Sequence, residues 1–191
     1  GTFSDVVHQH DLTQPLQWRL AWPLPQPLVV ADPGSRKDVS LEAKELEVEV
    51  SVNWEKNGSS ASGRPTAQAM RYRFDGSDFG MRPIPGHAGE YELFTTHKRF
   101  AFKRVKGRAW NLPQPAKCYG FPDQVRGYFQ NAAFLSDFEL AFEEQAGCIF
   151  YLGPLREYPK REYAWGGSQP SDMGRRGERV VEALLASRDQ G

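Results

Sequence analysis

The sequence predicts an α+β fold, with an antiparallel β-meander in the N-terminal half and helices plus one buried strand in the C-terminal half. Apolar and polar residues alternate from Leu16 to Trp22 and again from Leu46 to Trp54, which is the period of strands with one solvated face. Helical spacing of apolar residues begins only after Pro113. A continuous apolar run over 148–152 predicts a strand that is buried on both faces.

The N-terminal half continues the meander beyond these two segments. Met70 to Phe74 alternates as a third strand, and the Asp75-Gly76 pair that follows is typical of a hairpin turn. Shorter strands are expected over Tyr91 to Phe94 and over Phe100 to Val105. Because proline cannot donate to a strand ladder, the prolines at 23, 25 and 27 are expected to end the first strand.

The C-terminal half carries helix signals. Pro122 is well placed at a first helical turn, and Ser136 with Glu139 has the spacing of a capping box. Gly147 is expected to end this second helix, and a last helix is expected from about Arg176 to Arg188. We therefore expect a strand-rich part over 1–112 and a helical part over 113–191 that contains the strand 148–152 and the C-terminal helix.

Composition indicates a globular protein without a strong overall electrostatic field. The 191 residues are enough for one large or two small domains, and 39% of them are hydrophobic against 25% charged. Lys and Arg number 24 and so do Asp and Glu, so the balanced charge does not favour nucleic acid or anionic lipid over the whole chain. Only a local basic patch could do so.

The cysteine count and the hydropathy pattern indicate the cellular compartment of the chain. Cys118 and Cys148 are the only cysteines, with no CxxC spacing, so we expect neither a disulfide nor a zinc site and favour a reducing compartment. His8, His10 and Asp11 match no standard zinc spacing, and we expect no metal site there. No run approaches the roughly 18 apolar residues of a membrane span, so a cytoplasmic chain is expected.

One basic stretch has the composition of a single-strand nucleic-acid platform, because cations alternate there with aromatic residues. The same string arises from a solvated sheet face whose aromatics point into the core. An acidic strand around Glu45, Glu47 and Glu49 could also neutralise the patch. The candidate nucleic-acid contacts are Lys98, Arg99, Lys103, Arg104, Lys106 and Arg108.

Four arginines are candidates for a nucleotide or partner contact. Arg156 follows the predicted buried strand, at the end where α/β proteins place ligands, and Arg161 lies shortly after it. Pairing of Arg156 with a nearby carboxylate such as Glu157 or Glu162 is the alternative. Arg175 and Arg176 lie at the start of the predicted last helix, where two cations oppose the helix dipole and call for an anion or acidic neighbour.

No catalytic residue can be assigned. A phosphate-loop hydrolase needs the string GxxxxGK[ST], which this chain lacks, and a carboxylate after a buried strand to hold magnesium. The predicted strand is followed by Gly153-Pro154, with no acid. The scattered His, Ser and Cys residues also form no recognisable nucleophile arrangement.

Three strings, taken in order, resemble a known family. They are Gly1 to Val7, Tyr151 to Arg156 and Gly174 to Glu178, and the resemblance is strongest from Tyr119 to Leu185. The chain resembles the middle of bacterial predicted AAA-family ATPases of the ABC-type branch, which is related to the OLD, RecF and SMC proteins. In that family the Walker A loop precedes the first string, and the signature motif and Walker B follow the last.

The resemblance implies the function class. It implies a piece of an ATPase head that binds ATP and Mg between two paired heads, with DNA or an effector protein as partner and, in several cases, a role in phage defence. The absence of Walker A, signature and Walker B implies that the chain alone does not hydrolyse ATP. A start without Met and an end within a helical pattern also favour a segment of a longer chain.

The residues leave two other function classes open. One is a non-enzymatic nucleic-acid-binding domain that uses the basic stretch. The other is a protein-interaction insertion that uses aromatic surface around Trp18, Trp22 and Trp54.

Overall fold

The computed structural model describes two compact units, Gly1–Phe142 and Glu143–Gly191, which are treated separately below. The first unit ends at Phe142 rather than at the predicted boundary after residue 112, because the helices that follow residue 112 complete the core of the sheet. The described residues are 3–31, 40–56, 63–107, 111–151, 153–154, 157–164, 166–167 and 169–188.

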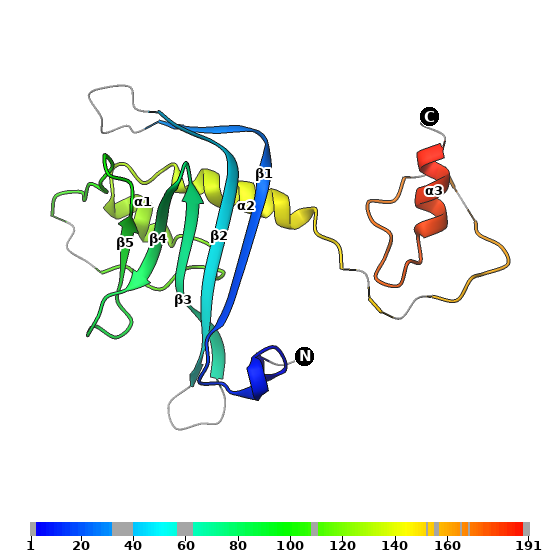
Figure 1. Cartoon of the computed structure of the whole chain (residues 1–191), viewed down its shortest axis with the longest axis horizontal. Helices are drawn as coiled ribbons and strands as arrows, with labels where there is room; N and C mark the ends of the chain where they lie inside the picture. The colour runs from blue at the N-terminus through cyan, green and yellow to red at the C-terminus, as the bar shows by residue number, and fades with distance from the viewer. Residues whose placement is uncertain are drawn as a thin grey trace. The chain divides into compact units, whose positions relative to one another are not determined.

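The first unit is built on the predicted antiparallel meander. Its strands pair in sequence order, β1-β2-β3-β4-β5, each antiparallel to the next (Figure 1). They are β1 Leu16–Ala31, β2 Ser40–Lys56, β3 Gly63–Phe74, β4 Ser77–Pro83 and β5 Tyr91–Thr95.

The prolines do not end β1, contrary to expectation. Pairing with β2 is interrupted between Pro23 and Leu28 and resumes to Ala31. Proline is tolerated because β1 is the first strand in the sheet order, and an edge strand can direct a missing N–H away from its neighbour.

Strand β4 was not predicted, because its sequence does not alternate clearly. It pairs with β3 through the Asp75-Gly76 turn, and Gly80 lies opposite Arg71. A Cβ at Gly80 would overlap the Met70 carbonyl oxygen and lie 2.9 Å from the Arg71 Cα. This close approach of two backbones explains why glycine interrupts the pattern.

Two helices cover one face of the sheet, α1 Asp123–Tyr128 and α2 Leu135–Gly147 (Figure 1). Pro122 precedes α1 as predicted, and Gly147 is the last residue of α2. The predicted capping box is wrong, because α2 already includes Ser136. The Glu139 carboxylate instead accepts a hydrogen bond from the Phe121 N–H and pairs with Arg126 at 2.9 Å.

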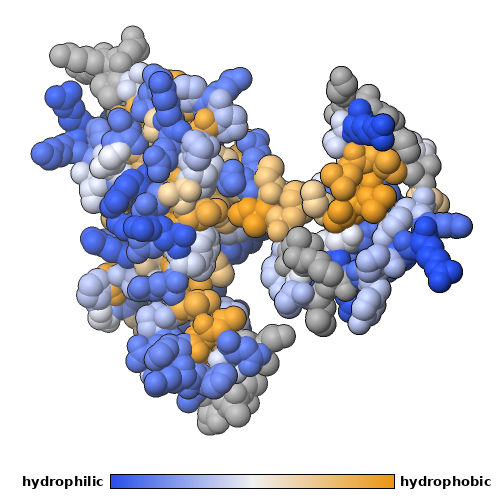
Figure 2. All heavy atoms as spheres, turned by 45° about the vertical axis from the view of Figure 1, so that its right-hand side comes forward, coloured by the Kyte–Doolittle hydropathy of each residue, from blue (hydrophilic) through white to orange (hydrophobic). Residues whose placement is uncertain are grey.

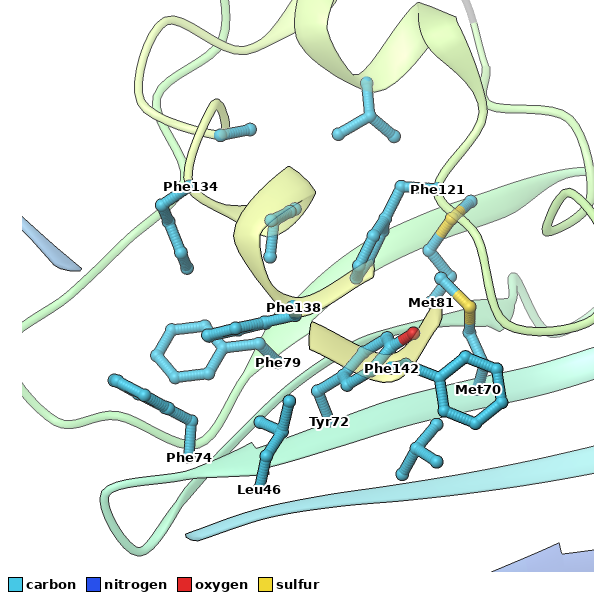
Figure 3. Packing of buried hydrophobic residues seen from close by; sticks show 14 of the residues in the cluster. Leu46, Met70, Tyr72, Phe74, Phe79, Met81, Phe121, Phe134, Phe138 and Phe142 are labelled. Atoms are coloured by element: carbon cyan, nitrogen blue, oxygen red, sulfur yellow. The ribbon is translucent and has the colours of Figure 1, made fainter. Parts of the chain in front are cut away.

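An aromatic core lies between α2 and the sheet. Phe138 is fully buried, and its ring centroid lies 4.9 Å from that of Phe74 and 5.6 Å from that of Tyr72 (Figure 3). Phe142 stacks on Trp18 at 5.8 Å. Trp22 is buried, so the predicted aromatic interaction surface is part of the packing. The third member, Trp54, stacks on Phe3.

The opposite face of the sheet carries charges that neutralise one another. Arg71 donates to Glu49 at 2.5 Å and to Asp78 at 3.1 Å, and Arg73 pairs with the same aspartate at 2.9 Å. Glu47 lies 3.9 Å from Arg73. Glu47 and Glu49 of β2 are therefore matched by arginines of β3 on the same face.

The predicted strand over Phe100 to Val105 is wrong. This segment lies outside the sheet and forms only an isolated bridge between Arg104 and Phe129. Its backbone pairs with the end of α1 and with the segment that follows this helix: Val105 N–H donates to the Tyr128 carbonyl and Gln130 N–H to that of Lys103. We call residues 100–105 the strap, because this segment lies against the helical layer and is held there by backbone hydrogen bonds.

The predicted buried strand over 148–152 is also wrong. Residues 148–151 follow α2 as turn and coil, and Ile149, Phe150 and Tyr151 are 56%, 60% and 71% exposed. Leu152 lies outside the described residues. The run is apolar without being buried, because within the described residues no strand lies beside it.

The second unit contains helix α3, Val180–Arg188, which starts about one turn later than predicted. Ala186 is the one hydrophobic residue classed as buried among the described residues of this unit. Figure 2 shows hydrophobic side chains on the visible surface of the unit. Within the described ranges, no helix of the chain is long and apolar enough to cross a membrane.

Candidate functional site

The second unit brings two of the resemblance-bearing strings together. The Gly153 N–H donates to the Arg175 carbonyl at 2.7 Å, and the Glu157 N–H donates to the Arg176 carbonyl at 3.0 Å. Gly153 is buried, and a Cβ there would lie 3.2 Å from the Arg175 carbonyl oxygen. Residues about 20 positions apart therefore form one corner, which we call the arginine corner (153–154 and 157 with 172–179).

Carboxylates shape the turn of the arginine corner from within. The Asp172 carboxylate accepts from the Gly174 N–H at 2.7 Å, and the Glu178 carboxylate accepts from the Arg176 N–H at 3.0 Å. Hydrogen bonds from its own N–H and from that of Arg176 lower the pKa of Glu178. Gly174 has φ +77°, where a Cβ would overlap the Glu178 carboxylate, so this turn requires glycine.

Both acids are thus engaged by backbone or by another arginine. Asp172 also lies 3.8 Å from the Arg179 guanidinium. Among the described residues, no ion pair joins these two acids to Arg175 or Arg176, although the charge of Arg176 also helps to lower the pKa of Glu178. Both arginines also precede the first turn of α3, which begins at Val180, so the helix-dipole argument does not apply to them.

The candidate arginines present their charge to solvent. Arg161, Arg175 and Arg176 are exposed, and among the described residues no carboxylate forms an ion pair with their guanidinium groups. Arg156 lies outside the described residues. Its predicted place after a buried strand no longer applies, because residues 148–151 are not a strand. Glu157, one predicted partner for it, pairs with Lys160 at 3.3 Å.

The chain alone does not fit a complete site for ATP and Mg. Arginines of the corner can contact phosphate oxygens, but Asp172 and Glu178 already accept hydrogen bonds from backbone amides. Magnesium needs carboxylate or hydroxyl ligands that keep open coordination positions. Within the described ranges, no group of three or more His, Cys, Asp and Glu residues is placed to hold a metal ion.

The basic stretch keeps its cations in solvent and its aromatics inside. Phe100 is buried edge-on against Phe79 at 5.7 Å, and Phe102 stacks on Phe134 at 6.4 Å. The aromatics therefore pack in the core and do not form a stacking platform. Arg108 lies outside the described residues, whereas the exposed cations are Lys98, Arg99, Lys103, Arg104 and Lys106.

Asn131 is the residue that sequence reasoning missed here. Its buried side chain accepts from the Lys103 N–H at 2.8 Å and donates to the Ala101 carbonyl at 2.9 Å, fixing the strap. An asparagine between two helix signals carries no sequence mark of this role, because its partners are some 30 residues away.

Replacing Asn131 by Ala is expected to lower the free energy of unfolding by about 1–3 kcal/mol, because two part-buried hydrogen bonds to the backbone of Ala101 and Lys103 are lost. The strap should also loosen. Hydrogen exchange at the Lys103 amide is expected to accelerate, whereas Gln130→Ala, which removes an exposed neighbouring side chain, should leave it unchanged. Unchanged exchange in Asn131→Ala would contradict this role.

A hollow of about 880 Å³ lies at one end of the sheet of the first unit. Its polar groups already bind one another: Thr66 donates to Glu55 at 2.9 Å, and the Tyr91 hydroxyl lies 3.4 Å from the Ala67 carbonyl. Burial of the Tyr91 hydroxyl raises its pKa, and the negative charge of Glu55 raises this pKa further. None of the sequence-predicted candidates lines this hollow.

Comparison with known proteins adds no relative: no protein family, curated protein or solved structure matches the chain.

Proposed function

We propose that this chain is a segment of an ABC-type ATPase head, and that the arginine corner is its contribution to a nucleotide or to the facing head. The observation that carries the proposal is the pair of hydrogen bonds from Gly153 and Glu157 to the backbone of Arg175 and Arg176. Two strings that resemble the family separately are thereby held as one local structure. Their exposed guanidinium groups suit the anionic oxygens of a phosphate.

The second unit supports the view that other parts of a head complete it. A unit of this size normally needs a core of its own, yet its described residues bury little apolar surface. Large exposed apolar side chains indicate an interaction surface. These are Ile149, Phe150, Tyr151, Tyr158, Tyr163, Met173 and Leu184.

The proposal separates the role of the chain from the chemistry of the whole head. The chain has no Walker A string, signature or Walker B string, so hydrolysis belongs to sequence outside it. Arg156, Arg161, Arg175 and Arg176 are the proposed contacts, with ATP and Mg held mainly by the missing motifs. The proposed partners are the remaining parts of the head and a second head, with DNA or an effector beyond them.

The test uses the complete product of the reading frame that encodes this chain. We expect a Walker A string before the present segment and a Walker B string after it, and ATP turnover by the purified protein. Arg156→Ala and the double change Arg175→Ala with Arg176→Ala should each lower turnover or head pairing at least about tenfold. Arg188→Ala, an exposed arginine in the last turn of α3, is the matched control.

Two results would overturn the proposal. A reading frame without phosphate-loop motifs on either side would remove the function class. Normal turnover and normal head pairing in the arginine variants would leave the class but remove the role of the corner.

A further inference from the structure

Strand β5 has an outer edge that is free over part of its length. Ile84 N–H donates to the Glu90 carbonyl and Thr96 N–H to the Asp78 carbonyl, so these pairs are of the hydrogen-bonded type. Alternation along an antiparallel ladder then turns the backbone groups of Leu93 and Thr95 away from β4. Within the described ranges, no backbone hydrogen bond joins these outward groups to another segment.

A groove of about 580 Å³ runs along this free edge. Four residues of β5 form one side, and the strap with Phe129 forms the other. Its walls expose both apolar side chains and polar groups, and the lining residues Phe100 and Phe129 are themselves buried. The lining residues are Glu92, Leu93, Phe94, Thr95, Phe100, Ala101, Phe102, Arg104 and Phe129.

The rim of the groove is positively charged. Arg104 lines it, with its guanidinium carbon 5.6 Å from the centre of the Phe129 ring, and exposed Lys98, Arg99 and Lys106 lie on the adjoining turns. The one acid in the groove, Glu92, is paired with Arg82 at 2.8 Å. Glu47 and Glu49 of β2, two of the acids that could have neutralised this patch, pair with arginines of the sheet face instead.

We propose that this edge groove binds an extended acidic peptide, which adds to the sheet as a further antiparallel or parallel strand beside β5. Outward N–H and C=O groups offer the backbone hydrogen bonds, and the apolar residues among the lining, such as Leu93 and Phe102, can contact alternate side chains of the peptide. The cationic rim selects acidic residues on the partner. Single-stranded nucleic acid is less favoured, because Phe100 and Phe102 are used by the core and a nucleic acid has no amide backbone to pair with the edge.

The probe is a fluorescein-labelled peptide of about ten residues that alternates Val and Glu, long enough to span β5. Fluorescence anisotropy with the whole chain is expected to show binding that weakens as salt rises. The same peptide N-methylated at alternate residues keeps its charge but loses the donors of one edge, and should bind about tenfold more weakly.

Protein variants distinguish the effect of the cations at the groove rim on peptide binding from the effect of the protein's net charge. The double change Arg104→Ala with Lys106→Ala is expected to weaken binding at least about fivefold. Lys44→Ala, which removes an exposed cation of β2, should leave binding unchanged. Circular dichroism confirms that each variant is folded.

Three results would overturn strand addition. They are no binding of the alternating peptide, equal binding of its N-methylated form, or tighter binding of an oligothymidylate with the same charge that also depends on Arg104. The last result would assign the groove to nucleic acid. All of these outcomes are independent of the proposed ATPase function, which rests on the other unit.

Discussion

Replacing Phe138 by Ala is expected to lower the free energy of unfolding by about 3–5 kcal/mol. Phe138 is fully buried and packs against rings from strands β3 and β4 and from its own helical layer, Phe74, Phe79 and Phe134 among them (Figure 3). Its removal leaves a cavity that those rings fill only in part, so both the transfer term and the lost contacts count against the fold.

Urea denaturation of the whole chain measures this effect, and the slope with denaturant should stay unchanged because the same surface is exposed on unfolding. Leu140→Ala is the matched control. Leu140 lies on the same helix but is 56% exposed, so its loss should change stability by less than about 0.5 kcal/mol. Equal losses in the two variants would show that α2 does not pack on the sheet as described.

Replacing Gly80 by Ala is expected to cost about 2–4 kcal/mol, although it adds a single methyl group. The new Cβ would overlap the Met70 carbonyl oxygen and lie 2.9 Å from the Phe94 ring. Backbone atoms cannot yield as a side chain can. Strands β3 and β4 must therefore separate at the pair of Arg71 with Gly80, which weakens their ladder.

Thermal unfolding compares this variant with Gly127→Ala. Gly127 is exposed in helix α1, and a Cβ there meets nothing within 4 Å. Alanine should stabilise that helix by up to about 1 kcal/mol. Opposite signs for the two glycines are expected. A neutral Gly80→Ala would mean that the two strands lie farther apart than in the structure.

Local sequence patterns were enough to predict much of the sheet. Strict alternation in β2 places valines on one face and glutamates on the other, and the Asp75-Gly76 pair marks the hairpin to β4. The extension of β1 through three prolines could not be predicted, because the tolerance of proline depends on its place at the edge of the sheet.

The same patterns misled where an apolar string had two physical explanations. Phe100 and Phe102 alternate with cations, as in a strand, yet they cover the helical layer from a strap fixed by Asn131. Ile149 to Tyr151 form an apolar run without neighbouring strands to bury it. Hydrophobicity favours the burial of an apolar side chain in free energy, but it does not determine which surface of the protein that side chain packs against.

The candidate site could likewise be predicted from the sequence only in part. The amino-acid sequence is enough to identify the charged residues Arg175 and Arg176, the lack of a phosphate-loop string and the two-residue period of the sheet. The hydrogen bond from Gly153 to Arg175, the bond from the Arg176 amide to Glu178 and the free edge of β5 are visible only in the folded chain. Composition and periodicity act between near neighbours, whereas these pairings join residues far apart in the chain.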